Sequence, residues 1–140
     1  MSPFLDSSAL AKRYLDEAGA DTVAPWLRAR GAAISRLAEV EVVSALCRRE
    51  RQGDLGAASL GRLLAMFDDD LRALRVIEVV PEVVMRARAL LRRHPLRASD
   101  GLHLASALAL QAAWLEPVQF ICYDRRLAAA ARAEGFATAP

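Results

Sequence analysis

Short apolar runs alternate with longer amphipathic stretches along the whole chain. Four of the short runs have features that are common in strands. Each is rich in β-branched or aromatic side chains or follows a glycine turn. In the longer stretches apolar residues recur every three or four positions, which predicts helices. We predict strands at residues 3–5, 32–34, 76–80 and 120–123. We predict helices at residues 9–15, 21–30, 37–51, 56–74, 81–93, 99–114 and from residue 125 to Gly135.

Strands separated by helices predict an α/β fold, in which a mostly parallel central sheet of four to five short strands is flanked by helices on both faces. The sequence shows no internal repeat, low-complexity tract or linker, so we expect one domain over residues 1–140. The predicted helix at residues 37–51 is apolar around most of its circumference, with Val40, Val42 and Leu46 among its apolar residues. We therefore expect this helix to be buried on several sides.

Acidic side chains stand where parallel sheets bind ligands, just beyond the carboxyl ends of the strands. Asp6 follows the first predicted strand, Asp124 follows the last, and Asp100 begins a helix after a loop. Glu41 lies between two valines of the apolar helix, where an ionised carboxylate is costly unless something compensates it. Glu39 competes with Glu41, because the two point in different directions around the helix and cannot both face one pocket.

Four carboxylates crowded together would raise one another's pKa, so such a group favours a hard divalent cation, Mg²⁺ or Mn²⁺. A metal bound there can activate a water for attack on phosphorus. The chain has only two histidines, which does not favour zinc. Each aspartate also has a simpler interpretation as a helix cap or a partner of the helix dipole. We interpret the acidic run at residues 68–70 as a solvated helix end.

The net charge does not by itself indicate a nucleic-acid-binding protein. Nineteen lysine and arginine residues stand against 17 acidic residues, which leaves a formal charge of +2. Any contact with phosphates must therefore come from a local arrangement of arginines. We interpret Trp26 and Trp114 as core or interface residues and His103 as a half-buried histidine. The arginines that fall near the acidic elements, as candidate phosphate contacts, are Arg13, Arg48, Arg97 and Arg125.

The apolar content of 54% is above that of most soluble domains and predicts that some surface is buried against another chain, so we expect a homodimer. Cys47 and Cys122 lie far apart in apolar runs, and no secretory leader precedes Asp6, so we expect a reduced, cytoplasmic protein. The longest uncharged run, residues 101–115, is shorter than a bilayer requires. We therefore expect no membrane span.

Each of the four acids lies within a short motif, and the motifs follow one another in order. They read FLDSSAL at residues 4–10, VEVVSAL at 40–46, LRASDGLHLA at 96–105 and FICYDRRL at 120–127. With these motifs the chain resembles the PIN-domain nucleases and, within them, the VapC-like toxins of type II toxin–antitoxin pairs. The resemblance covers nearly the whole chain.

The resemblance implies a Mg²⁺- or Mn²⁺-dependent endoribonuclease that a cognate antitoxin protein holds silent. It implies that the catalytic and metal-binding acids are Asp6, Glu41, Asp100 and Asp124, and thereby selects Glu41 over Glu39. Asp6 and Asp100 are then expected to bind the principal metal, while Asp124 assists a second ion.

Two positions next to these acids qualify the resemblance. Ser8 matches a small polar position that supports the first aspartate. Cys122 is a departure, because many relatives have threonine or serine two residues before the last acid, and it weakens the side of the site that would hold a second metal. The alternative function is a catalytically silent PIN-like module, which binds RNA or a protein partner without cleavage. The presence of acids in these motifs shows that a metal could be bound but does not by itself show catalysis.

Overall fold

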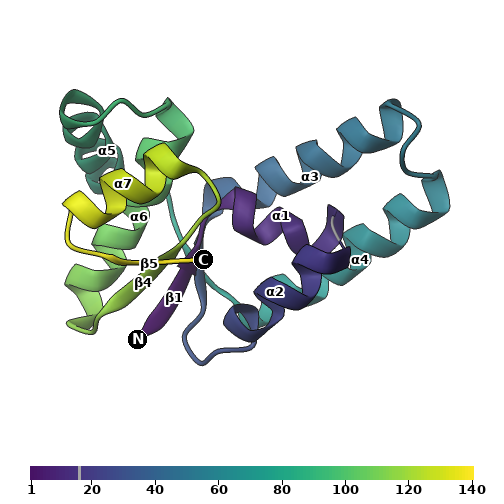
Figure 1. Ribbon diagram of the computed structural model, residues 1–140, viewed down its shortest axis with the longest axis horizontal. Coiled ribbons are helices and arrows are strands. Elements are labelled where there is room, and N and C mark those ends of the chain that lie inside the picture. Colours follow the sequence, from purple (N-terminus) through teal and green to yellow (C-terminus); the bar gives the residue numbers. More distant parts are fainter. Residues whose placement is uncertain (16) are drawn as a thin grey trace.

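Five short parallel strands form the centre of the structure, a computed structural model that describes residues 1–15 and 17–140 (Figure 1). The strands are β1 (Ser2–Leu5), β2 (Ala33–Ser35), β3 (Arg75–Ile77), β4 (Val118–Ile121) and β5 (Ala137–Ala139). Their spatial order is β3-β2-β1-β4-β5, and every neighbouring pair is parallel. The predicted α/β fold with four to five parallel strands is confirmed.

Helices cover both faces of the sheet (Figure 1). One face carries α5 (Pro81–Arg93), α6 (Ala98–Trp114) and α7 (Arg125–Ala133). The other face carries α1 (Ser7–Leu15), α2 (Glu17–Leu27), α3 (Arg36–Arg51) and α4 (Ala57–Ala73). Helices α3 and α4 form a hairpin that extends away from the sheet. Within the part of the chain that the structure describes, no helix is long and apolar enough to cross a membrane.

The two central strands supply side chains to both faces of the sheet. Phe4 of β1 and Phe120 of β4 are partners in register, and their rings stack with centroids 5.6 Å apart in the core beneath α5, α6 and α7. The next residues, Leu5 and Ile121, also pair, and they pack in the core with α1, α3 and α4. Successive residues of a strand point to opposite faces, so β1 and β4 are fixed between two cores.

The edges of the sheet differ from the sequence-based expectation. The predicted strand at residues 76–80 is wrong in its second half, because β3 ends at Ile77 and the side chains of Val79 and Val80 are exposed. Val80 occupies the N-cap of α5, where Pro81 takes the first helical turn and its missing N–H costs nothing. The sequence pattern does not predict β5, whose residues Ala-Thr-Ala form a strand by pairing with β4.

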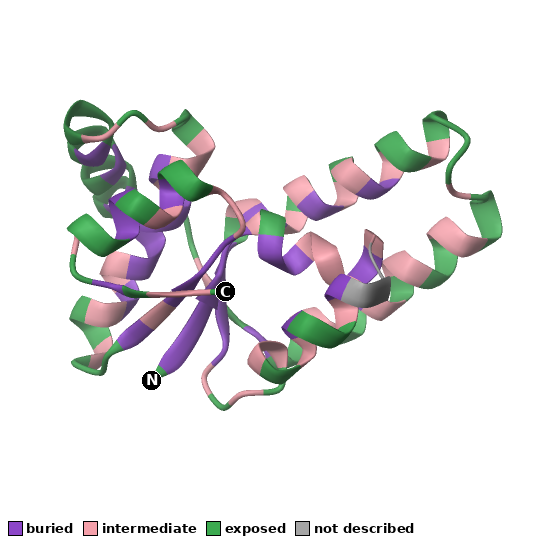
Figure 2. Cartoon of the chain, viewed as in Figure 1, coloured by how far each residue is buried: buried purple, intermediate pink, exposed green. Residues whose placement is uncertain are grey.

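The prediction that the helix at residues 37–51 is buried on several sides is wrong. The fully buried side chains of α3 are Ala38, Val42 and Leu46, which follow one another at four-residue spacing along a single face. Val40 is 63% exposed. Helix α3 belongs to the hairpin that extends from the sheet, and its buried side chains pack in the core that also contains residues of α1 and α4 (Figure 2).

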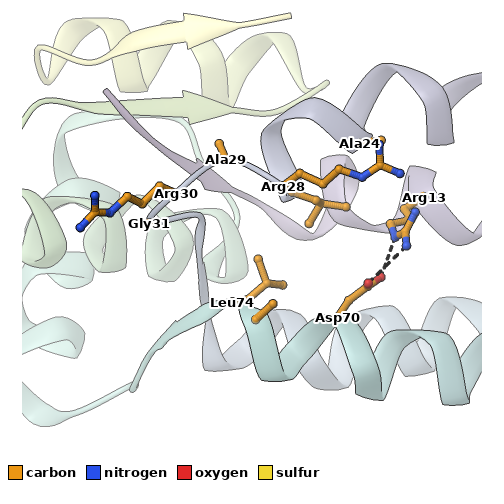
Figure 3. A pocket seen from close by; sticks show the side chains of 10 residues that line it. Arg13, Ala24, Arg28, Ala29, Arg30, Gly31, Asp70 and Leu74 are labelled. Atoms are coloured by element: carbon orange, nitrogen blue, oxygen red, sulfur yellow. Dashed lines mark hydrogen bonds and ion pairs between the residues drawn. The ribbon is translucent and has the colours of Figure 1, made fainter.

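The interpretation of residues 68–70 as a solvated helix end is wrong for Asp70. Asp70 Oδ2 accepts a hydrogen bond from Arg13 Nε at 2.6 Å (Figure 3). It accepts a second hydrogen bond from the Tyr14 hydroxyl, also at 2.6 Å. Successive residues point about 100° apart around a helix, so three in a row cannot all face solvent when one side of α4 packs on α1. Asp70 thus joins the two helices beside the ring contact between Tyr14 and Phe67.

Replacing Asp70 with alanine is expected to lower the free energy of unfolding by about 1–3 kcal/mol, because the buried Tyr14 hydroxyl loses its acceptor. The matched control is Asp69→Ala, since Asp69 pairs with Arg72 on the exposed side of α4 and such pairs contribute less than about 1 kcal/mol. Urea unfolding of the two variants measures the difference. Equal losses of stability would contradict the role assigned to Asp70.

Candidate active site

Asp6 lies directly beyond the carboxyl end of the central strand β1 and is only 3% exposed. Its backbone N–H donates to the carbonyl of Ile121 at 3.1 Å, which extends the pairing of β1 with β4 by one residue. Its Oδ1 accepts hydrogen bonds from the Ala9 N–H at 2.9 Å and from the Ser8 hydroxyl at 2.7 Å. Asp6 therefore caps α1 and also presents a buried carboxylate, which Ser8 holds in one orientation.

The pKa values show that three aspartates interact. Burial raises the pKa of Asp6 against the hydrogen bonds from Ala9 and Ser8, and the charge of Asp100 raises it further. Burial also raises the pKa of Asp100, and the neighbouring Asp124 carboxylate adds to this effect. We call Asp6, Asp100 and Asp124 the aspartate group. Mutual repulsion makes such a group a favourable place for a cation.

A cavity of about 290 Å³ lies beside two members of the aspartate group. Asp124 reaches it from the start of α7, where its Oδ1 accepts a hydrogen bond from the Leu127 N–H at 3.0 Å. Asp100 reaches it from the first turn of α6. The residues that line this cavity, which we call the α6–α7 cavity, are Pro95, Arg97, Asp100, Asp124, Arg125 and Arg126. The structure thus places the predicted arginines Arg97 and Arg125 next to the acids.

Cys122 lies close to the aspartate group. Leu5 pairs with Ile121, so the following residues, Asp6 and Cys122, lie next to each other at the edge of the sheet. Burial raises the pKa of the Cys122 thiol to about 12, with contributions from the charges of Asp6, Asp124 and Asp100. Hard divalent cations such as Mg²⁺ take oxygen ligands, so a thiol at this position is a poor ligand for them. The Cys122 thiol donates a hydrogen bond to the Asp124 carbonyl at 3.5 Å and brings no oxygen ligand to the aspartate group.

Glu41 contacts His103, which lies on the same helix as Asp100. The two side chains meet with 2.6 Å between Glu41 Oε1 and His103 Nε2, and Ser7 Oγ lies 3.2 Å from the same nitrogen. Burial opposes ionisation of Glu41, but its contact with His103 leaves the pKa of Glu41 lowered. Glu39 instead accepts a hydrogen bond from the exposed Arg36 at 2.7 Å. The structure therefore turns Glu41, and not Glu39, towards α6 and the site.

His103 is a site residue whose role the sequence underestimates. It is 1% exposed rather than half-buried, and it connects Glu41 on α3 with Ser7 on α1. Within the described residues its Nδ1 has no hydrogen-bond partner. The signal in the sequence is the spacing of Asp100 and His103, which places both on one side of α6.

The four predicted phosphate contacts do not all reach the acids. Arg13 is committed to Asp70, through Nε and a second hydrogen bond of 3.2 Å, and lines a different cavity of about 510 Å³ between the ends of α2 and α4 (Figure 3). The ion pair with Asp70 gives Arg13 a structural contact, and its predicted contact with a phosphate stays a prediction. Arg48 lines a cavity of about 520 Å³ next to Ser8, on the side of the aspartate group opposite to Arg97.

The oxygen donors of the aspartate group fit a hard divalent cation. Mg²⁺ keeps several waters and takes one or two carboxylates from a protein, and Asp6 and Asp100 are the two whose raised pKa values a cation would lower. In residues 1–15 and 17–140, no three acidic, histidine or cysteine side chains converge closely enough to form a complete ligand set. A cation held here would therefore complete its coordination with water or substrate oxygens.

Comparison with known proteins identifies the family. The PIN domain family matches residues 4–133 of the chain. The chain belongs to this family. Ribonuclease VapC45 of Mycobacterium tuberculosis is 36% identical to this PIN domain over 139 residues, which cover 98% of this chain and 94% of the relative. Ribonuclease VapC47 of the same organism is 30% identical over 141 residues, which cover 97% and 94%.

Solved structures share the fold of this PIN domain. One is VapBC2 from Rickettsia felis bound to a DNA fragment from their promoter, with a TM-score of 0.69, 11% identity, and coverage of 99% of this chain and 98% of that chain. Another is a toxin–antitoxin complex from Klebsiella pneumoniae, with a TM-score of 0.66, 16% identity and coverage of 91% of both chains. At these identities the likeness shows the fold alone.

The raised pKa of Asp6 predicts how stability depends on pH in the absence of metal. The contribution of this carboxyl is most favourable below its ordinary pKa of 3.8 and is lost as the pH rises through the higher pKa of the folded protein. Asparagine does not ionise, so Asp6→Asn is expected to be at least as stable as the parent at pH 7 in EDTA. Its advantage should shrink towards pH 4.

Urea unfolding between pH 4 and pH 8 measures this difference. Asp54→Asn, at an exposed aspartate in the turn between α3 and α4, is the matched control and should leave the free energy of unfolding unchanged. If Asp6→Asn is less stable than the parent at every pH, burial of the ionised Asp6 carboxylate does not lower the free energy of unfolding, which would contradict the prediction.

Proposed function

We propose that this PIN domain, spanning residues 1–140, is the endoribonuclease toxin of a toxin–antitoxin pair. The observation that carries the proposal is the buried carboxylate of Asp6 at the carboxyl edge of the central strands, where the charge of Asp100 raises the pKa of Asp6 and the charge of Asp124 raises that of Asp100. Arginines on both sides of this acidic group offer contacts for the phosphates of an RNA strand. Its curated relatives carry the name ribonuclease VapC, which supports the same reaction.

Asp6 and Asp100 are the residues that would hold Mg²⁺ or Mn²⁺, with Asp124 and Glu41 contributing further oxygens or positioning water. The metal supplies a water of lowered pKa and a positive charge near the leaving oxygen. Ser8 keeps the Asp6 carboxylate in its orientation, and His103 holds Glu41 at the side of the site. The protein residues thus provide a fixed set of oxygens at the edge of a rigid sheet.

Arg97 and Arg125 line the cavity that contains Asp100 and Asp124, and Arg48 stands on the other side of Asp6. An arginine binds a phosphate through two parallel N–H groups, so these side chains would hold the RNA backbone on each side of the cleaved bond. They also offset the negative charge that the aspartate group presents to an anionic substrate.

A cognate antitoxin and a second copy of the chain are the protein partners that we propose. The structural neighbours include toxin–antitoxin complexes, which supports an antitoxin. Exposed apolar side chains on α3 and α5, among them Val40, Val84 and Met85, support a homodimer. Cys47 and Cys122 are free, which favours action in the reducing cytoplasm.

A silent module that binds RNA or protein without cleavage is the second candidate. Two observations favour it: the described acids do not form a complete ligand set, and Cys122 brings no oxygen ligand to the aspartate group. The two candidates differ in turnover, which can be measured directly.

Purified protein is expected to cleave single-stranded RNA when Mg²⁺ or Mn²⁺ is present and not in EDTA. Asp6→Asn and Asp100→Asn should lower the rate by about a hundredfold or more, because the charge that a metal stabilises in the transition state amounts to several kcal/mol. Gel analysis of an end-labelled RNA measures the rate. RNA that is bound but uncut by the folded parent protein would favour the silent module.

Glu41→Gln and Glu39→Gln form a matched pair for the same assay. The first should reduce cleavage at least tenfold, since it removes the ionised carboxylate that His103 holds at the site. The second should leave cleavage unchanged, because Glu39 contacts the exposed Arg36. The opposite result would show that the wrong glutamate has been assigned.

A further inference from the structure

A second cavity lies on the other side of Asp6 from the α6–α7 cavity. It has a volume of about 520 Å³ and is formed by α1, α3 and the loop that follows β4. Its polar lining consists of Ser8, Lys12, Arg48, Arg49, Gln52 and Tyr123. We call it the α1–α3 cavity. Its volume is within the range of cavities that bind small organic molecules.

A hydrogen bond links a residue of the α1–α3 cavity to the aspartate group. Ser8, which lines the cavity, donates a hydrogen bond to Asp6 and accepts one from the Tyr123 N–H at 3.3 Å. Tyr123 is followed by Asp124, which lines the α6–α7 cavity. Both cavities therefore border the aspartate group.

The side chains of the α1–α3 cavity have the chemistry of a nucleotide site. Lys12 Nζ lies 4.5 Å from the centre of the Tyr123 ring, so a cation and an aromatic ring stand together. Arg49 is fixed by a hydrogen bond to the Leu15 carbonyl at 3.2 Å, and Arg48 is exposed beside it. Of the described residues that line the cavity, none is acidic. Cations suit a phosphate, and an aromatic ring suits the face of a base.

We propose that the α1–α3 cavity binds one unstacked nucleotide of the RNA, next to the bond that is cut. Its base packs against Tyr123 and its phosphate meets Lys12 and Arg48. A base in a duplex is stacked and paired and cannot enter such a cavity. This inference rests on the proposed function, because it assigns the α1–α3 cavity to one nucleotide of the RNA that the aspartate group would cut.

Binding of a fluorescent single-stranded RNA of twelve nucleotides, measured by anisotropy in EDTA, tests the proposal without cleavage. Tyr123→Leu should weaken binding about tenfold or more, while Tyr123→Phe, which keeps the ring, should bind like the parent. A twelve-base-pair RNA duplex should bind all three proteins alike. Circular dichroism and thermal unfolding check that each variant is folded, and the Phe variant shows whether the ring itself is needed.

Arg48→Ala and Arg28→Ala form the matched pair for the phosphate contact. Arg48→Ala should weaken single-strand binding and reduce its salt dependence by about one phosphate contact. Arg28 is an exposed arginine in the cavity that contains Arg13, and its replacement should change neither.

Unchanged binding by folded Tyr123→Leu, equal weakening of single strand and duplex, or equal effects of the two arginine variants would each overturn the proposal. Intact single-strand binding that depends on Tyr123, in a protein that cuts no RNA when Mg²⁺ is added, would uphold the nucleotide site and reject the nuclease.

Discussion

The burial of a carboxylate at the end of the central strand is the constraint on which the site depends. Asp6 is almost completely removed from water, and the hydrogen bonds from Ser8 and Ala9 do not offset the loss of hydration, so its pKa stays raised. Asp100 and Asp124 add like charge from two other elements. The folded protein therefore holds unfavourable electrostatic energy at this edge, which a cation would relieve.

That arrangement persists because the strands beneath it cannot move easily. Phe4 and Phe120 pack in one core while Leu5 and Ile121 pack in the other, so β1 and β4 are held from both faces. Their register places Asp6 beside Cys122 at the edge of the sheet. Rigid elements suit a site in which a few oxygens must keep fixed positions, since a small displacement would separate the donors.

The charges around the acids are divided in space. Arginines of the α6–α7 cavity lie on one side, and the cations of the α1–α3 cavity lie on the other, with the aspartate group between them. The net charge of +2 conceals this division. Arg13 shows that an arginine near an acid in sequence can instead join two helices, because its partner Asp70 lies on α4 and is distant in sequence.

The sequence by itself determined the alternation of helices and strands, the parallel α/β fold and the positions of Asp6, Asp100 and Asp124 beyond strands or at helix starts. These follow from local patterns of apolar residues and from caps, which act over a few residues. The resemblance to PIN-domain nucleases also pointed to Glu41, while periodicity left Glu39 equally open.

Only the tertiary structure decided which polar side chains meet. In the folded protein Glu41 contacts His103, and Arg13 contacts Asp70. Tyr123 lies beside both Ser8 and Lys12. The tertiary structure also formed β5 from a segment without a strand pattern and left most of α3 outside the core. Contacts between residues far apart in the chain depend on how whole elements pack, and a local pattern carries no information about the partner.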